Sequence, residues 1–161
     1  MGMSKRARMM ILAVVVMAAA CGSTAGTDGA GQYTTLAGTP ALLSDLQGKP
    51  TVVNFFASWC TPCRLEMPDF EKVHTQFGDR VNFLGLNVQE DLKRAQSIVT
   101  DTKVTYTIGL DPKGKVFRQY KAVNMPSTVL LDASGALAEL HQGAMTAADL
   151  TKLIHDKLGV T

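Results

Sequence analysis

Hydrophobic and polar residues follow one another along this chain in patterns that predict strands and helices in turn. Residues 51–56 (Thr-Val-Val-Asn-Phe-Phe) are mostly β-branched or aromatic, which is typical of a strand buried on both faces. Residues 81–88 form a second strand of this kind. After Trp59 the apolar residues recur at helical spacing, and Gly78 marks the end of that helix. We expect Pro68, inside this segment, to kink the helix rather than end it.

Weaker patterns precede and follow these segments. Residues 42–46 predict a short amphipathic turn that ends at Gly48. Residues 92–99 predict a second amphipathic helix, and residues 106–110 predict a short strand. Residues 115–120 fit either a helical turn or a loop, and the pattern does not decide between them.

The last third of the chain predicts a hairpin followed by a helix. Strands are expected at residues 127–131 and 136–142, because the short turn between them carries Gly135. Thr146 and Asp149 have the spacing of a capping box at the start of a final helix. A parallel strand–helix–strand half is thus joined to an antiparallel half. This order predicts an α/β fold with a central mixed β-sheet and helices on both faces.

The first twenty residues show a different pattern. Three basic residues within the first eight precede Met9–Ala20, an unbroken apolar run of 12 residues. A membrane-spanning helix needs about 20 apolar residues, so this run is too short to be one. It fits the apolar centre of an export signal. Small residues then lead directly to Cys21, and the whole arrangement resembles a bacterial lipoprotein signal.

This resemblance implies that residues 1–20 are a signal peptide and that Cys21 carries the lipid that anchors the protein. Ala18 stands where the common pattern has Leu, so an ordinary secretory signal is the alternative. In both cases we expect an extracytoplasmic protein, and with the lipid it is anchored to the membrane of a bacterial cell envelope. Residues 21–32 predict a flexible tether, which leaves residues 33–161 for one folded domain.

Charge excludes one class of function. The net charge is +2, but removing the three basic residues of the signal leaves 13 basic against 14 acidic residues. The folded part therefore lacks the basic surface of a nucleic-acid-binding protein. It also carries no haem, flavin or nucleotide motif, so we expect no cofactor.

The two cysteines of the folded part predict redox chemistry. Cys60 and Cys63 lie directly after a buried strand, in the first turn of a predicted helix. Helix N-terminal N–H groups stabilise a thiolate, so Cys60 is the expected nucleophile that attacks a partner's disulfide. Two intervening residues bring the sulfurs within disulfide distance, and Cys63 then resolves the mixed disulfide. Pro62 suits the first helical turn, and Trp59 provides an apolar wall beside the nucleophile.

Other interpretations of the cysteine pair fit less well. A zinc site needs four ligands, and neither His74 nor His141 has the spacing to complete one, so we expect no metal. A purely structural disulfide across so small a loop removes little chain entropy. A thioredoxin-fold peroxidase has a Pro-x-x-x-Thr-x-x-Cys pattern, and Val53 and Ala57 occupy the Pro and Thr positions.

Residues 54–68 (Asn-Phe-Phe-Ala-Ser-Trp-Cys-Thr-Pro-Cys-Arg-Leu-Glu-Met-Pro) resemble the TlpA/ResA-like branch of the thioredoxin superfamily. The resemblance extends from about Tyr33 to the C-terminus. It implies a thioredoxin fold and a membrane-tethered disulfide reductase outside the cytoplasm, in a group that often serves cytochrome c maturation. The implied partners are disulfides or dithiols of exported proteins, such as apocytochrome c, and a membrane redox protein that recycles the dithiol. We expect a monomer.

The resemblance also implies roles for two polar residues near the cysteines. Asn54 stands where cytoplasmic thioredoxins have a buried aspartate that moves protons, and a buried amide satisfied by the backbone is the alternative. Glu66 follows Cys63 by three residues, where cytochrome-maturation members carry an acidic residue. A carboxyl group so close to the sulfurs has a raised pKa and influences the proton of the inner thiol. The alternative is a solvated carboxylate on the helix surface.

Met125 and Pro126 match the loop that faces the dithiol in this fold. The resemblance implies a cis bond between them, a Met125 backbone that pairs with an extended substrate strand, and a Pro126 without an N–H that helps to keep metals from the sulfurs. The usual loop is Gly-x-Pro-Thr-Thr. Asn124 and Ser127 depart from it, which leaves the substrate preference open.

The direction of electron flow also stays open. Reduction potentials in this fold extend from about −270 mV to about −120 mV. The resemblance favours a reductase, and an oxidase that inserts disulfides into exported proteins is the alternative. A non-catalytic lipoprotein that binds partners along the Met125–Pro126 loop is the alternative from another class. The intact residues Trp59, Cys60 and Cys63 argue against it, since a binding module needs no dithiol.

Overall fold

A computed structural model describes residues 30–161. The expected signal peptide, Cys21 and most of the expected tether lie outside the described residues. The strands are β1 (Gln32–Thr35), β2 (Pro40–Leu42), β3 (Thr51–Phe56), β4 (Asn82–Val88), β5 (Thr107–Asp111), β6 (Ser127–Leu131) and β7 (Leu137–Gln142). The helices are α1 (Thr61–Phe77), α2 (Leu92–Thr102), α3 (Lys115–Gln119) and α4 (Ala147–Leu158), with a 3-10 turn, η1, at Leu43–Leu46.

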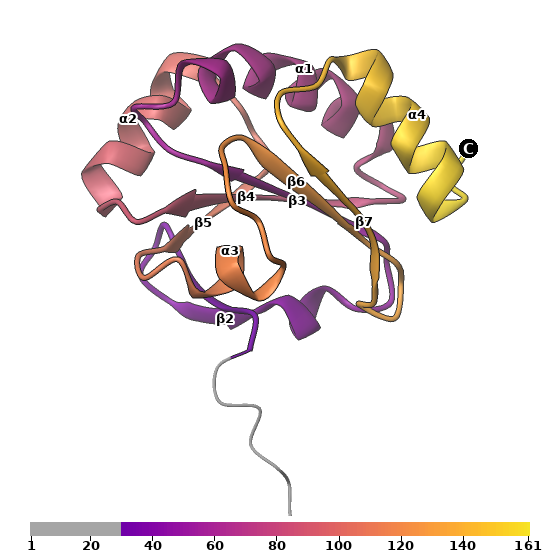
Figure 1. Ribbon diagram of the computed structural model, residues 1–161, viewed down its shortest axis with the longest axis horizontal. Coiled ribbons are helices and arrows are strands. Elements are labelled where there is room, and N and C mark those ends of the chain that lie inside the picture. Colours follow the sequence, from indigo (N-terminus) through magenta and orange to yellow (C-terminus); the bar gives the residue numbers. More distant parts are fainter. Residues whose placement is uncertain (1–29) are drawn as a thin grey trace, which may run out of the picture.

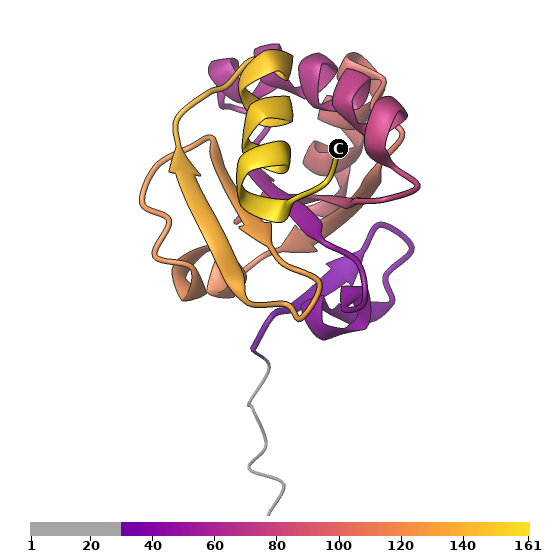
Figure 2. The same cartoon turned by 90° about the vertical axis from the view of Figure 1, so that its right-hand side faces the viewer.

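The seven strands form one mixed sheet in the order β2-β1-β5-β4-β3-β6-β7 (Figure 1). Strands β3, β4 and β5 are parallel, and the remaining pairs are antiparallel. Helices α1, α2 and α4 cover one face of the sheet, while α3 and η1 cover the other, as Figures 1 and 2 both show. The predicted α/β fold with helices on both faces is confirmed.

Each face of the sheet has its own core, and strand β3 contributes to both. Phe56 packs with Met67 of α1 and Leu150 of α4, whereas Phe55 packs with Val116 of α3 on the opposite face. Successive side chains of a strand point to opposite faces, which is why the Phe55-Phe56 pair supplies one ring to each core. Both rings are completely buried, as expected for a central strand covered on both sides.

The sheet brings three chain segments together at one edge. Strand β3 ends at Phe56, four residues before Cys60, and Phe56 is paired with Asn87 near the end of β4. Strand β6 runs the other way, and its first residue, Ser127, is paired with Phe55. The segments after β3, after β4 and before β6 are therefore neighbours, and this edge positions the cysteines.

Two strands were not predicted, and one undecided segment is a helix. Strands β1 and β2 are only four and three residues long, and they gain their hydrogen bonds from each other and from β5. Helix α3 begins where the Asp111 carboxylate accepts hydrogen bonds from the N–H groups of Lys115 (2.8 Å) and Phe117 (2.9 Å). This cap comes from the end of a strand, so the hydrophobic pattern of 115–120 alone did not reveal it. Helix α1 continues through Pro68.

Candidate active site

Cys60 and Cys63 form a disulfide at the N-terminus of α1, with their Cα atoms 5.3 Å apart. Cys60 is the N-cap residue of the helix, and its Sγ accepts a hydrogen bond from the Cys63 N–H at 3.2 Å. Pro62 occupies the first turn, where a missing N–H removes no helical hydrogen bond. In the reduced protein the same N–H groups and the helix dipole stabilise a thiolate at Cys60.

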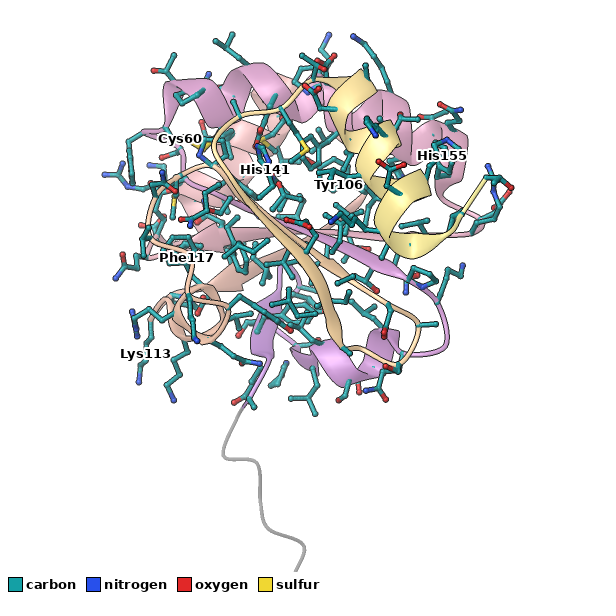
Figure 3. All side chains as sticks on the ribbon, turned by 45° about the vertical axis from the view of Figure 1, so that its right-hand side comes forward. Cys60, Tyr106, Lys113, Phe117, His141 and His155 are labelled. Atoms are coloured by element: carbon teal, nitrogen blue, oxygen red, sulfur yellow. A yellow bond between two sulfur atoms is a disulfide. The ribbon has the colours of Figure 1, made fainter. Side chains whose placement is uncertain are left out.

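Burial distinguishes the two sulfurs. Cys63 is completely buried, whereas Cys60 keeps 3% of its surface exposed. Figure 3 shows Cys60 on the side of the helical layer opposite His155. Cys60 is therefore the more accessible of the two cysteines.

The residues that flank the disulfide differ strongly in exposure. Trp59 has 68% of its surface exposed and lines a groove of about 720 Å³ on the side of α2. The Met125–Pro126 peptide bond is cis, and Pro126 is buried while Met125 is half-buried. The Pro126 carbonyl accepts a hydrogen bond from the Gly143 N–H at 2.9 Å, which fixes the loop against the chain that follows β7.

Glu66 is a buried carboxyl group one turn beyond Cys63. Its Oε1 accepts a hydrogen bond from Asn54 Nδ2 at 2.8 Å, and its Oε2 accepts one from the Met145 N–H at 3.2 Å. Burial raises the pKa of Glu66 to about 7, although both hydrogen bonds favour the ionised form. The alternative of a solvated surface carboxylate is wrong, since Glu66 is only 3% exposed.

Asn54 connects three elements through its side chain. Its Nδ2 donates to Glu66 on α1 and, at 3.3 Å, to Thr128 Oγ1 on β6. Both partners are side chains, so the alternative of an amide satisfied by the backbone is wrong. The Oδ1 atom of Asn54 has no protein partner among the described residues. The amide therefore orients one oxygen of Glu66, and its own position follows from the pairing of Asn54 with Thr128 in the sheet.

Comparison with known proteins identifies the family. A family model described as the AhpC/TSA family matches residues 29–140, which is well over half of the chain. The chain belongs to the AhpC/TSA family.

Curated relatives of this AhpC/TSA-family chain include a thioredoxin-like protein and several thiol-disulfide oxidoreductases. The thioredoxin-like protein YneN of Bacillus subtilis (strain 168) is 32% identical over 119 residues, which cover 72% of this chain and 69% of YneN. The thiol-disulfide oxidoreductase ResA of Geobacillus kaustophilus (strain HTA426) is 31% identical over 120 residues, which cover 74% of this chain and 69% of ResA. Across eight curated relatives, these two included, the match covers from 60% to 70% of the relative's own length.

A solved structure of a disulfide oxidoreductase is also similar to this chain. The secreted disulfide oxidoreductase of Mycobacterium tuberculosis, homologous to E. coli DsbE, has a TM-score of 0.68 and 29% identity, and the match covers 75% of this chain and 91% of that one. Together with the Cys60–Cys63 pair, these relatives show that the chain is a protein disulfide oxidoreductase with a thioredoxin-like fold.

One carboxylate at this AhpC/TSA-family site was not among the predicted residues. Glu90 follows β4, and its Oε2 accepts a hydrogen bond from the Ser58 N–H at 2.6 Å and one from Asn87 Nδ2 at 2.8 Å. Its Oε1 accepts one from the Ser58 hydroxyl at 2.5 Å. Partial burial raises the pKa of Glu90, but the hydrogen bonds from Ser58 and Asn87 outweigh it and lower the pKa, so the group is ionised at neutral pH. The sequence feature that could have identified Glu90 is its position directly after β4, the strand that pairs with β3.

Two methionines and a histidine pack against other residues of the fold. Met67 and Met145 are in the core. His74 is half-buried and packs against Phe83 and Tyr106, with ring centroids 5.2 and 5.9 Å apart. Within residues 30–161, His, Cys, Asp and Glu side chains form no group of three or more suited to a metal ion. No helix in that range is both long and apolar enough to span a membrane.

Proposed function

We propose that the protein is a disulfide reductase that works outside the cytoplasm and passes two electrons from the Cys60–Cys63 dithiol to disulfides of exported proteins. The observation that carries this proposal is the buried Glu66 carboxyl, with a pKa of about 7, one turn from Cys63. A carboxylate near the dithiol disfavours thiolates in the reduced form. The disulfide form of the protein is then favoured, which is the condition for giving electrons away.

The reaction proceeds in two exchange steps. The Cys60 thiolate attacks one sulfur of the partner's disulfide, so that a Cys60–partner bond forms, the partner's own disulfide breaks, and its second sulfur leaves as a thiolate that takes up a proton. Cys63 then gives its proton to ionised Glu66 and attacks Cys60. The Cys60–Cys63 bond forms, the mixed disulfide breaks, and the partner leaves as a dithiol that has gained two electrons and two protons.

Glu66 serves the second step. Cys63 is completely buried, so solvent does not reach its thiol directly in the folded protein. Glu66 lies three residues further along the same helix face, where side chains are neighbours. A group whose pKa lies near neutral pH accepts a proton and releases it again with little cost, which suits this transfer.

The partner's polypeptide meets exposed apolar residues beside Cys60. Trp59 is 68% exposed, and Val123, just before the Met125–Pro126 loop, is 78% exposed. These side chains offer apolar contact to a segment that presents its disulfide, and the Met125 backbone offers hydrogen bonds to an extended strand. Apocytochrome c is one such substrate within this proposal.

Location and anchoring are part of the proposal. Residues 1–20 act as a signal peptide, Cys21 carries the lipid, and a tether leads from it to the working domain, whose first strand begins at Gln32. The pattern of the first 21 residues supports export, and so does the similarity to the secreted oxidoreductase of M. tuberculosis. A membrane redox partner then returns electrons to the oxidised dithiol of the anchored monomer.

The test is the equilibrium between the full-length protein and glutathione redox buffers, followed by the fluorescence of Trp59. A reduction potential near or below about −230 mV supports the reductase, whereas a value near about −120 mV overturns it in favour of an oxidase. Replacing the outer cysteine (Cys60→Ser) distinguishes a binding module. A reductase loses all disulfide exchange, while a pure binder keeps its partners.

A further inference from the structure

Glu90 holds the segment that leads from β3 to Cys60. Both of its carboxylate oxygens are occupied, because the N–H and the hydroxyl of Ser58 donate to different oxygens and Asn87 donates a third hydrogen bond. Asn87 is completely buried and pairs with Phe56, so its side chain is a fixed support. Two hydrogen bonds to one residue fix both the position and the orientation of the Ser58 peptide, two residues before the nucleophile.

The turn that carries Glu90 directs its side chain toward Ser58. Gln89 has a φ of 58°, in the left-handed region, and its N–H donates to the Asp111 carbonyl at 3.1 Å. This single left-handed residue turns the chain back toward β3 directly after β4 ends. Non-glycine residues seldom adopt this conformation, and a surrounding structure must stabilise it. The hydrogen bonds of Glu90 and Gln89 provide that stabilisation.

The charge of Glu90 acts on the same cysteine. Consecutive Cα atoms are about 3.8 Å apart, so Ser58, which the carboxylate contacts, lies at most about 8 Å from Cys60. Asp91 and Arg94 are the charged neighbours of Glu90 along the groove beside Trp59, and the positive charge of Arg94 helps to lower the pKa of Glu90. A negative charge held against this segment disfavours the Cys60 thiolate and leaves the uncharged disulfide unaffected.

We propose that Glu90 is a positioning residue of the Cys60–Cys63 site, which fixes Ser58 and Trp59 in front of Cys60 and makes the dithiol more reducing through its negative charge. This inference rests on the proposed reductase, because a more reducing dithiol serves a protein that gives electrons away. It assigns Glu90 no contact with the reacting sulfurs.

The chain offers a matched control for this carboxylate. Glu71 on α1 accepts hydrogen bonds from the N–H of Thr105 (2.7 Å) and from its hydroxyl (2.6 Å), the same arrangement that joins Glu90 to Ser58. Both glutamates are half-buried. Glu71 lies two turns beyond Cys63, so Glu71→Gln removes an equivalent charge and disturbs an equivalent pair away from Cys60.

The experiment compares full-length wild type, Glu90→Gln and Glu71→Gln in glutathione buffers at low ionic strength. We expect Glu90→Gln to shift the equilibrium toward the dithiol by about threefold, or about 14 mV at 29.6 mV per tenfold change. The pKa of the Cys60 thiol, followed by thiolate absorbance, falls in the same variant. Glu71→Gln shifts neither quantity. Equal equilibria in the two variants overturn the proposal.

A second variant tests the positioning role separately. Ser58→Ala keeps the charge of Glu90 but removes the hydroxyl hydrogen bond. We expect the time-resolved anisotropy of Trp59, the only tryptophan, to report faster indole motion with an unchanged Cys60 pKa. If the indole in Ser58→Ala moves as it does in the wild type, the proposal is overturned. Should Glu90→Gln fail to fold, the Ser58→Ala measurement is the one that tests the proposal. If the wild type itself does not equilibrate with glutathione, the proposed function fails. If the wild type equilibrates but Glu90→Gln and Glu71→Gln have equal equilibria, only the role of Glu90 fails.

Discussion

Replacing the buried carboxyl of Glu66 by an amide changes how the stability of the protein depends on pH. The pKa of Glu66 rises from its usual 4.5 to about 7 in the folded protein. The folded state therefore binds a proton that the unfolded state has released between these two pH values, and stability falls as pH rises through this window. The stabilisation is complete below pH 4.5 and lost above pH 7. At about 1.4 kcal/mol per pH unit, the loss is about 3 kcal/mol.

Glu66→Gln removes this dependence but also loses a hydrogen bond. The two oxygens of Glu66 accept from Asn54 and Met145, and a glutamine has only one oxygen to offer them. One buried donor is then unpaired, which costs about 2 kcal/mol. We expect the variant to be about 2 kcal/mol less stable than wild type at pH 4 and about 1 kcal/mol more stable at pH 8.

Urea unfolding of the oxidised proteins at both pH values measures the difference, because the disulfide removes the cysteine titrations. With an m value of about 1.5 kcal/mol/M, a change of 3 kcal/mol moves the relative midpoints by about 2 M urea. Glu71→Gln is the control for exchanging a carboxylate on the same helix. A difference between wild type and Glu66→Gln that stays the same at pH 4 and pH 8 would refute the assignment of a raised pKa to this buried group.

Three further predictions concern the resolving cysteine, the hydrogen bonds of Glu66 and the packing of the sheet. Cys63→Ser stops the reaction after the first exchange, so substrate disulfides remain attached to Cys60, and mass spectrometry should detect an adduct that Cys60→Ser lacks. Asn54→Ala removes a hydrogen bond that favours the ionised form of Glu66, so its pKa rises further and the loss of stability in the urea series extends to higher pH; an unchanged window contradicts this. Gly109→Ala places a Cβ 2.5 Å from the Tyr33 ring and 3.0 Å from Leu86. This overpacking should destabilise the fold by about 1–3 kcal/mol, which thermal unfolding measures, and a midpoint equal to that of the wild type contradicts the close approach.

The parts of the site that lie on one helix were predictable from the sequence. Cys60, Cys63 and Glu66 follow one another at intervals of three residues, so a helix prediction alone places them on one face. Resemblance to a family added the Met125–Pro126 loop. The central strands β3 and β4 were equally visible, since burial on both faces gives a run of mostly apolar residues.

The rest depends on contacts between residues distant in sequence. Met145 donates to Glu66 across 79 positions, and Glu90 accepts from Ser58 across 32. Neither pair has a spacing that a local pattern reveals, because each follows from the order and register of strands. Strand β1 was missed for the same reason, as its four residues become a strand only by pairing with β2 and β5.

The sheet edge explains why two carboxylates lie in the surroundings of one disulfide. Parallel strands β3 and β4 end side by side, so the polar residues that follow them are neighbours, and Glu90 reaches Ser58. Strand β6 begins at the same edge and brings Thr128 to Asn54, which orients Glu66. Glu66 thus approaches the dithiol from the helix side and Glu90 from the strand side. Both disfavour thiolates, so their effects on the equilibrium add in the direction of a reductant. A dithiol whose helix N-terminus alone set its chemistry would be more oxidising, and the two carboxylates oppose that tendency.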